Sequence, residues 1–226
     1  IIGKNGAGKT VLANILSGSR QPDQGEVLLG GTPIRFKNQA DAFRRGIVFS
    51  PQHLALLENG TVFDNLSGSD TIRACFGAQK RQCEQRITEA LAAVHLDCTP
   101  HTPVRLLSYA EKYLLQFSRS LLFRPRLLIL DELSAALSDV ELQTVFRLLR
   151  RCRDEGTAIL YFTHSAQQLP AWVDAVHTLR DGQLSDGARL PGTAVQNPYP
   201  RLRHTHGKPV LQTEHLTNAY LQDISL

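Results

Sequence analysis

The sequence predicts an α/β fold with a parallel core sheet covered by helices. Short apolar runs alternate along the chain with segments of helical periodicity, which is the order expected of strand–helix–strand units. Leu127–Leu130 is apolar at every position, as expected of a strand that is buried on both faces of a parallel sheet. Ile1-Ile2 reads as the end of another buried strand, and it leads directly into a glycine-rich turn and a helix.

The first fifty residues predict two helices, one hairpin and a second core strand. In chain order these are a helix over Lys9–Ser17, a hairpin of Val27–Leu29 and Ile34–Phe36, a short helix over Asp41–Arg45 and a strand over Ile47–Phe49. Gly18 and Gly46 should close the two helices, because glycine adopts the left-handed conformation after a helix at little cost.

Residues 61–123 change character and are expected to be mostly helical. The segment Gln79–Val94 is amphipathic, with its apolar side chains on one face. The elements expected after this region are the strand Leu127–Leu130, a helix opened by the capping box Ser138–Glu141 and ended at Gly156, a strand over Ala158–Phe162, and a hairpin of Val176–Leu179 with Gln183-Leu184.

The end of the sequence indicates a domain boundary. Residues 191–209 contain four prolines and no apolar period, which is typical of an interdomain linker. Val210–Leu226 returns to strand-like alternation but is too short to fold alone, so we expect it to begin a second domain. The chain contains no methionine, and we expect it to be a fragment of a longer protein.

The composition narrows the class of protein. Lys and Arg number 25 and Asp and Glu 21, a net charge of +4, and no run of five basic residues occurs, so no nucleic-acid partner is expected. No stretch approaches the roughly 18 apolar residues of a membrane-spanning helix, and Gly3–Gly6 follows Ile1-Ile2 too closely for a signal peptide. The four cysteines form no CxxC pair and are expected to be reduced thiols.

Residues 3–10 fit the phosphate-binding pattern G-x-x-x-x-G-K-[ST]. Glycines let successive backbone N–H groups turn towards the β- and γ-phosphates of a nucleotide, and the following helix directs its positive dipole at them. The lysine adds a point charge, and the threonine hydroxyl can ligate Mg²⁺. The expected phosphate-binding residues are Gly3, Lys4, Asn5, Gly6, Ala7, Gly8, Lys9, Thr10 and Val11.

Polar residues follow three of the predicted core strands. Asp131 and Glu132 end the apolar strand Leu127–Leu130, where Asp131 would face Mg²⁺ and Glu132 a water near the γ-phosphate. His164 follows the strand Ala158–Phe162, and Gln52 follows Ile47–Phe49. Ligands of open α/β sheets gather at such strand ends, although either residue alone is more often structural.

The order of these motifs resembles that of the nucleotide-binding domains of ABC transporters. The resemblance covers about residues 1–190 and includes the phosphate loop, the Gln52 loop, a helical insert, the Asp131-Glu132 strand and His164. It also includes a signature segment composed of Leu107, Ser108, Tyr109, Ala110 and Glu111.

The sequence is more specifically similar to the first half of the tandem ATPase subunits of bacterial sugar importers. The matching segments are Gln21–Glu26, Gly46–Val48, Leu130–Glu132 with Ser134–Ser138, and Leu179–Gly182. Pro209–Leu226 resembles the start of the second ATPase copy.

The resemblance implies a P-loop NTPase fold of the ABC ATPase type, with a parallel core sheet, an antiparallel β portion and a helical subdomain at about residues 65–123. The domain would span residues 1–190 and lack its N-terminal strands, one of which carries the adenine-stacking aromatic residue in relatives. Residues 191–209 would be a linker, and residues 210–226 would begin a second nucleotide-binding domain.

The family also implies cofactors, catalytic roles and partners. Gly6, Gly8, Lys9 and Thr10 would bind ATP, and Thr10, Gln52 and Asp131 would hold Mg²⁺. Glu132 would polarise the attacking water and His164 would stabilise the γ-phosphate, so that ATP hydrolysis drives sugar or small-solute import. The expected partners are transmembrane permease subunits, a second nucleotide-binding domain in the same parent chain or a second copy, and, indirectly, a periplasmic solute-binding protein. The location would be the cytoplasmic face of the bacterial inner membrane.

Two departures from the family pattern leave alternatives open. The signature is usually close to Leu-Ser-Gly-Gly-Gln, whereas here Glu111 would place a carboxylate beside a partner's polyphosphate, and we expect the ATP site that uses this signature to be impaired. Leu133 stands where proline is usual, a change we expect to be tolerated. The alternatives to an ATPase are a non-catalytic nucleotide-binding coupling module and a non-functional fragment of such a subunit.

Overall fold

The chain folds around three sheets flanked by helices. The computed structural model describes residues 1–67, 80–133, 137–166, 169–170, 172–186, 211–218 and 220–224. In chain order its elements are α1 (Lys9–Leu16), β1 (Gln24–Leu29), β2 (Thr32–Ile34), α2 (Gln39–Arg44), β3 (Ile47–Ser50), α3 (Val62–Ser67), α5 (Lys80–Ala93), η1 (Val104–Leu106), α6 (Tyr109–Leu121), β4 (Leu127–Asp131), α7 (Asp139–Asp154), β5 (Ala158–Phe162), β6 (His177–Arg180), β7 (Gln183–Asp186), β8 (Leu211–Asn218) and β9 (Leu221–Ile224).

The core is the predicted parallel sheet. Strands β3, β4 and β5 pair in parallel in that order. Ile2 forms parallel bridges to Thr163 and Thr178, so the first residues of the chain lie between β5 and β6. The loop that follows Ile2 therefore leaves the sheet on the same edge as the ends of β4 and β5.

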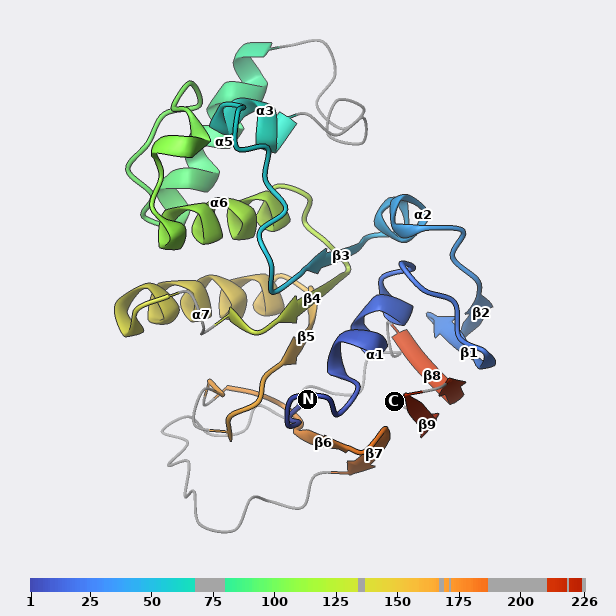
Figure 1. Cartoon of the computed structure of the whole chain (residues 1–226). Helices are drawn as coiled ribbons and strands as arrows, with labels where there is room; N and C mark the ends of the chain where they lie inside the picture. The colour runs from blue at the N-terminus through green and yellow to red at the C-terminus, as the bar shows by residue number, and fades with distance from the viewer. Residues whose placement is uncertain are drawn as a thin grey trace.

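Two apolar clusters lie on opposite sides of this sheet. Along β4, Leu127 and Ile129 join the cluster that contains α1, whereas Leu128 and Leu130 join the cluster that contains α6 and α7. Figure 1 shows α1 and α7 on opposite faces of the strands. Because every residue of β4 is buried, its uniformly apolar sequence is explained by the two covered faces.

The helical part of the chain also agrees with the sequence. Ile87, Leu91 and Val94 are buried on one side of α5, as the periodicity predicted. Capping boxes open both α6, at Ser108, and α7, at Ser138. The predicted start of the α5 segment at residue 79 and the proposed linker over residues 191–209 lie outside the described residues.

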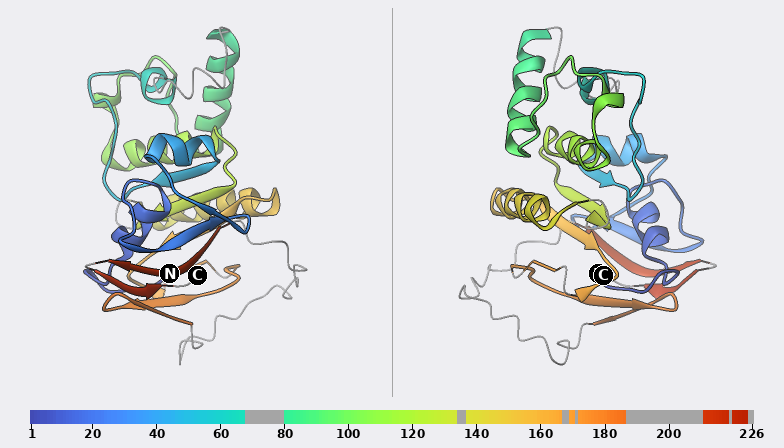
Figure 2. Two further views of the ribbon diagram at one scale, coloured as in Figure 1. Left: turned by 90° about the vertical axis from the view of Figure 1, so that its right-hand side faces the viewer. Right: turned by 60° about the vertical axis from the view of Figure 1, so that its left-hand side comes forward.

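The antiparallel sheet contains an arrangement that the sequence analysis did not anticipate. Its strand order is β2-β1-β8-β9, and β8 pairs with β1 from Leu29↔Leu211 to Gln24↔Thr217. Leu216 and Leu221 are buried in the same cluster as α1. Figure 2 shows these late strands beside the early strand β1. The segment expected to begin a second domain thus completes the sheet of the first, while its assignment to a second domain stays a prediction.

The predictions about membrane-spanning helices and about the cysteines can be compared with the described residues. Within them, no helix has the length and apolarity needed to cross a membrane. Cys83, Cys98 and Cys152 are free thiols, and Cys75 lies outside the described part of the chain.

Candidate functional site

The phosphate loop lies between the core strand at Ile2 and helix α1. Gly6 and Gly8 have φ values of 83° and 104°, a left-handed conformation that side chains disfavour. The backbone N–H of Ala7 donates to the carbonyl of Lys4 at 3.1 Å, which closes the turn. No side chain caps α1, so the first-turn N–H groups remain available to an anion.

Lys9 is held inside this loop with its charge directed at the end of β4. Its Nζ donates to the carbonyl oxygen of Gly3 at 2.7 Å and to that of Lys4 at 3.2 Å. The same Nζ lies 3.5 Å from Oε1 of Glu132. The lysine therefore supplies a preoriented positive charge at the mouth of the loop, as the sequence motif predicted.

Asp131 and Thr10 form a pair of hard oxygen donors. Asp131 is only 2 % exposed, and the Thr10 hydroxyl donates to its Oδ2 at 3.1 Å. Burial raises the pKa of Asp131, and the hydrogen bond from Thr10 and the charge of Lys9 oppose this rise only in part. A buried carboxylate beside a hydroxyl fits Mg²⁺, which prefers oxygen ligands and would supply the missing positive charge.

Glu132 is the point at which the predicted catalytic residues meet. Gln52 Nε2 donates to its Oε2 at 3.1 Å, and His164 Nδ1 lies 3.2 Å from its Oε1. Lys9 approaches the same Oε1. The backbone of Glu132 has a φ of 48°, which is rare for a residue with a side chain, and its carbonyl accepts from the Tyr113 hydroxyl at 3.2 Å.

The sheet explains why residues so far apart in sequence converge. Gln52, Glu132 and His164 each follow a parallel strand, and parallel strands end at one edge of the sheet. The glycine loop leaves from that edge as well, because Ile2 pairs with Thr163. A phosphate chain in the loop would therefore face a carboxylate, an amide and an imidazole.

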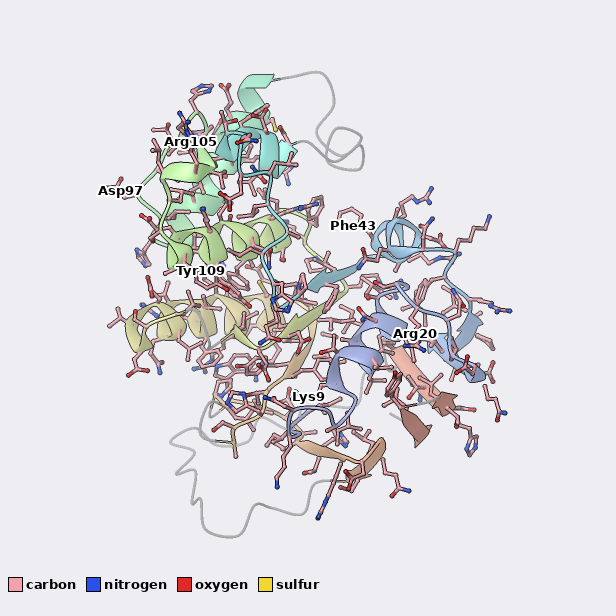
Figure 3. All side chains as sticks on the ribbon, in the orientation of Figure 1. Lys9, Arg20, Phe43, Asp97, Arg105 and Tyr109 are labelled. Atoms are coloured by element: carbon pink, nitrogen blue, oxygen red, sulfur yellow. The ribbon has the colours of Figure 1, made fainter. Side chains whose placement is uncertain are left out.

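The signature residues lie elsewhere. Leu107 and Ser108 precede α6, whose first turn contains Tyr109, Ala110 and Glu111. Figure 3 shows Tyr109 at the helical part of the chain and Lys9 at the start of α1. No described contact joins the signature to the phosphate loop, which is the arrangement expected if the signature serves another nucleotide site.

Glu111 closes the helix end that the signature would present to a phosphate. Its Oε2 accepts from the backbone N–H of Ser108 at 2.7 Å, and its own N–H donates to the Ser108 hydroxyl at 3.2 Å. These hydrogen bonds lower the pKa of Glu111, so the carboxylate stays ionised. The anion position at this helix N-terminus is thus filled by a residue of the same chain.

Strand β9 and the residue before it lie beside the phosphate loop, which the sequence did not predict. The placement of the adenine-stacking residue before Ile1 stays a prediction. Tyr220 lies in the turn between β8 and β9, and its backbone is near Gly8. A Cβ on Gly8 would come within 2.6 Å of the Leu221 side chain and 3.3 Å of the Tyr220 carbonyl oxygen. The Tyr220 ring is exposed, and the Arg20 guanidinium lies 5.7 Å from its centroid. The pairing of β8 with β1 brings this turn to the phosphate loop.

A cavity of about 330 Å³ lies beside the Gln52 loop. Phe43 and Phe123, which meet edge to face at 4.3 Å, form part of its lining together with Pro51 and Arg119. Burial lowers the pKa of Arg119. No hydrogen bond or ion pair of this guanidinium is seen within the described residues, which makes the cavity suitable for an apolar segment with a carboxylate.

Comparisons with known proteins identify the family of this chain. A family profile described as ABC transporter matches residues 1–135. A ribose import ATP-binding protein of Rubrobacter xylanophilus is 31 % identical over all of this chain and 48 % of the relative, and a putative ribose/galactose/methyl galactoside import ATP-binding protein of Burkholderia cenocepacia is 35 % identical over all of this chain and 46 % of the relative. The chain therefore spans about half the length of the curated relatives it matches.

Solved structures share the fold at low sequence identity. The ADP- and phosphate-bound dimer of the ATP-binding cassette MJ0796 has a TM-score of 0.72 at 19 % identity, over 82 % of this chain and 83 % of that one. The protein cbiO1 from Clostridium perfringens, part of the ABC transporter complex cbiONQ, has a TM-score of 0.67 at 23 % identity, over 81 % of this chain and 73 % of that one.

Proposed function

The chain belongs to the ABC transporter family, and from this premise we propose that it is the ATP-binding and ATP-hydrolysing part of a subunit that energises import of a sugar or similar small solute. The single observation that carries the proposal is the convergence of Lys9, Gln52 and His164 on the Glu132 carboxylate. These groups match the needs of phosphoryl transfer, which depends on positioning and charge stabilisation.

The phosphate loop would hold the nucleotide. The N–H groups at the start of α1 and the Lys9 ammonium would bind the β- and γ-phosphates. Thr10 and Asp131 would hold Mg²⁺ directly, and Gln52 would offer its amide oxygen Oε1 while its Nε2 still donates to Glu132. Bound Mg²⁺ neutralises charge that develops on the phosphate oxygens.

Glu132 would act on the water that attacks the γ-phosphate. Its side chain is only 10 % exposed, and its carboxylate already lies near three potential hydrogen-bond donors. Incoming phosphate would take over Lys9 and His164 and free the carboxylate to accept a proton from water. His164 would then stabilise negative charge on the γ-phosphate oxygens.

The partners follow from the same proposal. Transmembrane permease subunits would contact the cavity beside the Gln52 loop, and a permease carboxylate would pair with Arg119. A second nucleotide-binding domain, in the same parent chain or a second copy, would complete each ATP site. A periplasmic solute-binding protein would act through the permease, and the ATPase would sit at the cytoplasmic face of the inner membrane.

Transport in membrane vesicles tests this function. We expect vesicles that contain the full-length gene product and its permease to take up ribose or galactose only when ATP is supplied, and to hydrolyse ATP faster when solute-loaded binding protein is present. ATP binding without hydrolysis under these conditions would instead support the non-catalytic coupling module. Neither binding nor hydrolysis would support the non-functional fragment.

Glu111 provides a separate prediction about the second composite site. The Glu111→Gln change should raise steady-state ATP hydrolysis of the full-length protein about tenfold, because it removes a repulsion of roughly 1–3 kcal/mol between a carboxylate and a partner-bound polyphosphate. The measurement is phosphate release at saturating ATP.

A matched control exists in the second capping box. Glu141 makes the same hydrogen bonds to Ser138 at the start of α7, which is not part of the signature. Glu141→Gln should change stability as much as Glu111→Gln does, but leave hydrolysis unaltered. Equal rates in both variants would contradict the proposed inhibition by Glu111.

A further inference from the structure

A hydrogen bond from the Tyr113 side chain joins helix α6 to the backbone of Glu132. Tyr113 lies one turn after the signature and is 1 % exposed. Its hydroxyl donates to the carbonyl oxygen of Glu132 at 3.2 Å. Burial raises the pKa of Tyr113, so the hydroxyl keeps its proton and remains a donor. The bond supports a backbone whose φ of 48° is otherwise unfavourable.

The next turn of the same helix is attached to the Gln52 loop. Gln116 is 5 % exposed and uses both ends of its amide. Its Nε2 donates to the Pro51 carbonyl at 3.0 Å, and its Oε1 accepts from the Ala55 N–H at 2.8 Å. These two bonds bracket Gln52 and fix the course of the loop around it. A buried amide with both groups satisfied specifies one geometry.

These contacts close a ring, because Gln52 Nε2 donates to Glu132 Oε2 at 3.1 Å. The ring runs from α6 through Tyr113 to Glu132, across to Gln52, and back through the loop and Gln116 to α6. Neither Tyr113 nor Gln116 approaches the phosphate loop in any described contact. Their influence on the site must therefore pass through Glu132 and Gln52.

We propose that Tyr113 and Gln116 are positioning residues that link the orientation of the Glu132 carboxylate and the Gln52 amide to the position of the signature helix α6. A shift of α6 would move both groups together, so that engagement of the signature in one ATP site changes the water-activating geometry of the other. This inference rests on the proposed ATPase function, and it adds the route by which the two sites communicate.

The hydroxyl of Tyr113 can be removed without its ring. Tyr113→Phe in the full-length protein should lower kcat about tenfold and leave the KM for ATP within about twofold, because binding groups are untouched. Tyr161→Phe is the control, since Tyr161 is another buried tyrosine of the same apolar cluster. It should leave kcat unchanged. A kcat loss matched by Tyr161→Phe would overturn the proposal.

Hydrogen exchange gives a readout that does not require activity. In the ring, Tyr113→Phe should speed amide exchange at residues 52–57, with which Tyr113 makes no described hydrogen bond. Gln116→Met should speed exchange at residues 131–133. The kcat losses of the two variants should combine to less than their product in the double variant.

The outcomes separate the two proposals. The full-length protein could hydrolyse ATP while the variants show only local exchange changes and kcat losses that multiply. That result would disprove the ring and leave the ATPase function intact. Propagated exchange changes in a protein that does not hydrolyse ATP support the ring as a structural link and reject the ATPase function on which its catalytic role rests.

Discussion

Replacing Glu132 with Gln should reduce ATP hydrolysis by about 10²–10⁴-fold, the range typical of losing a general base. The amide has the size of the carboxylate but cannot accept a proton from water. ATP binding should persist, because Lys9, Thr10 and the loop N–H groups are unchanged, and Lys9 is freed from its 3.5 Å contact with the carboxylate. Phosphate release and binding of a fluorescent ATP analogue in the full-length protein measure the two effects separately.

The control for this variant is Glu155→Gln. Glu155 is an exposed residue that pairs with Arg151 at 2.9 Å near the end of α7, remote from the site. It should retain full hydrolysis and transport. If Glu132→Gln also retains both, the catalytic role of this half of the protein is wrong and hydrolysis must take place at another site.

Replacing Gly25 with Ala should destabilise the fold by about 3 kcal/mol and release β8 from β1. Gly25 has a φ of 80° at the irregular point of the pairing, and an added Cβ would lie 2.4 Å from the His215 carbonyl oxygen and 2.5 Å from that of Glu214. Backbone atoms cannot move aside as a side chain can. Urea unfolding monitors the stability, and hydrogen exchange of residues 211–218 monitors the strand.

Gly30→Ala is the matched control because it adds backbone strain without a steric clash between the new Cβ and a neighbouring strand. Gly30 also has a positive φ, of 61°, but a Cβ there meets nothing within 4 Å. Gly30→Ala should cost about 1 kcal/mol, the strain of the left-handed conformation alone, and leave residues 211–218 protected. Persistent protection of residues 211–218 in Gly25→Ala would contradict the close approach of β8 to Gly25.

The local motifs of this chain could be predicted because each combines its turn and its chemistry in a few adjacent residues. The glycines of residues 3–8, the lysine that follows and the acidic end of β4 are recognisable without any partner. Periodicity likewise predicted α5 and α7, because one apolar face must be buried wherever the helix packs. The parallel order of the strands then determined that Gln52, Glu132 and His164 meet at one edge.

The sequence by itself therefore determined the α/β class, the glycine-rich loop and the polar residues that follow the core strands. Only the tertiary structure decided how the signature helix is joined to them and which strand completes the antiparallel sheet. Tyr113 and Gln116 reach partners 19 and 65 residues away, and β8 pairs with a strand from the start of the chain. Such contacts depend on how the helices and strands pack against one another. The residues next to a side chain in sequence therefore do not determine which distant carbonyl it will hydrogen-bond.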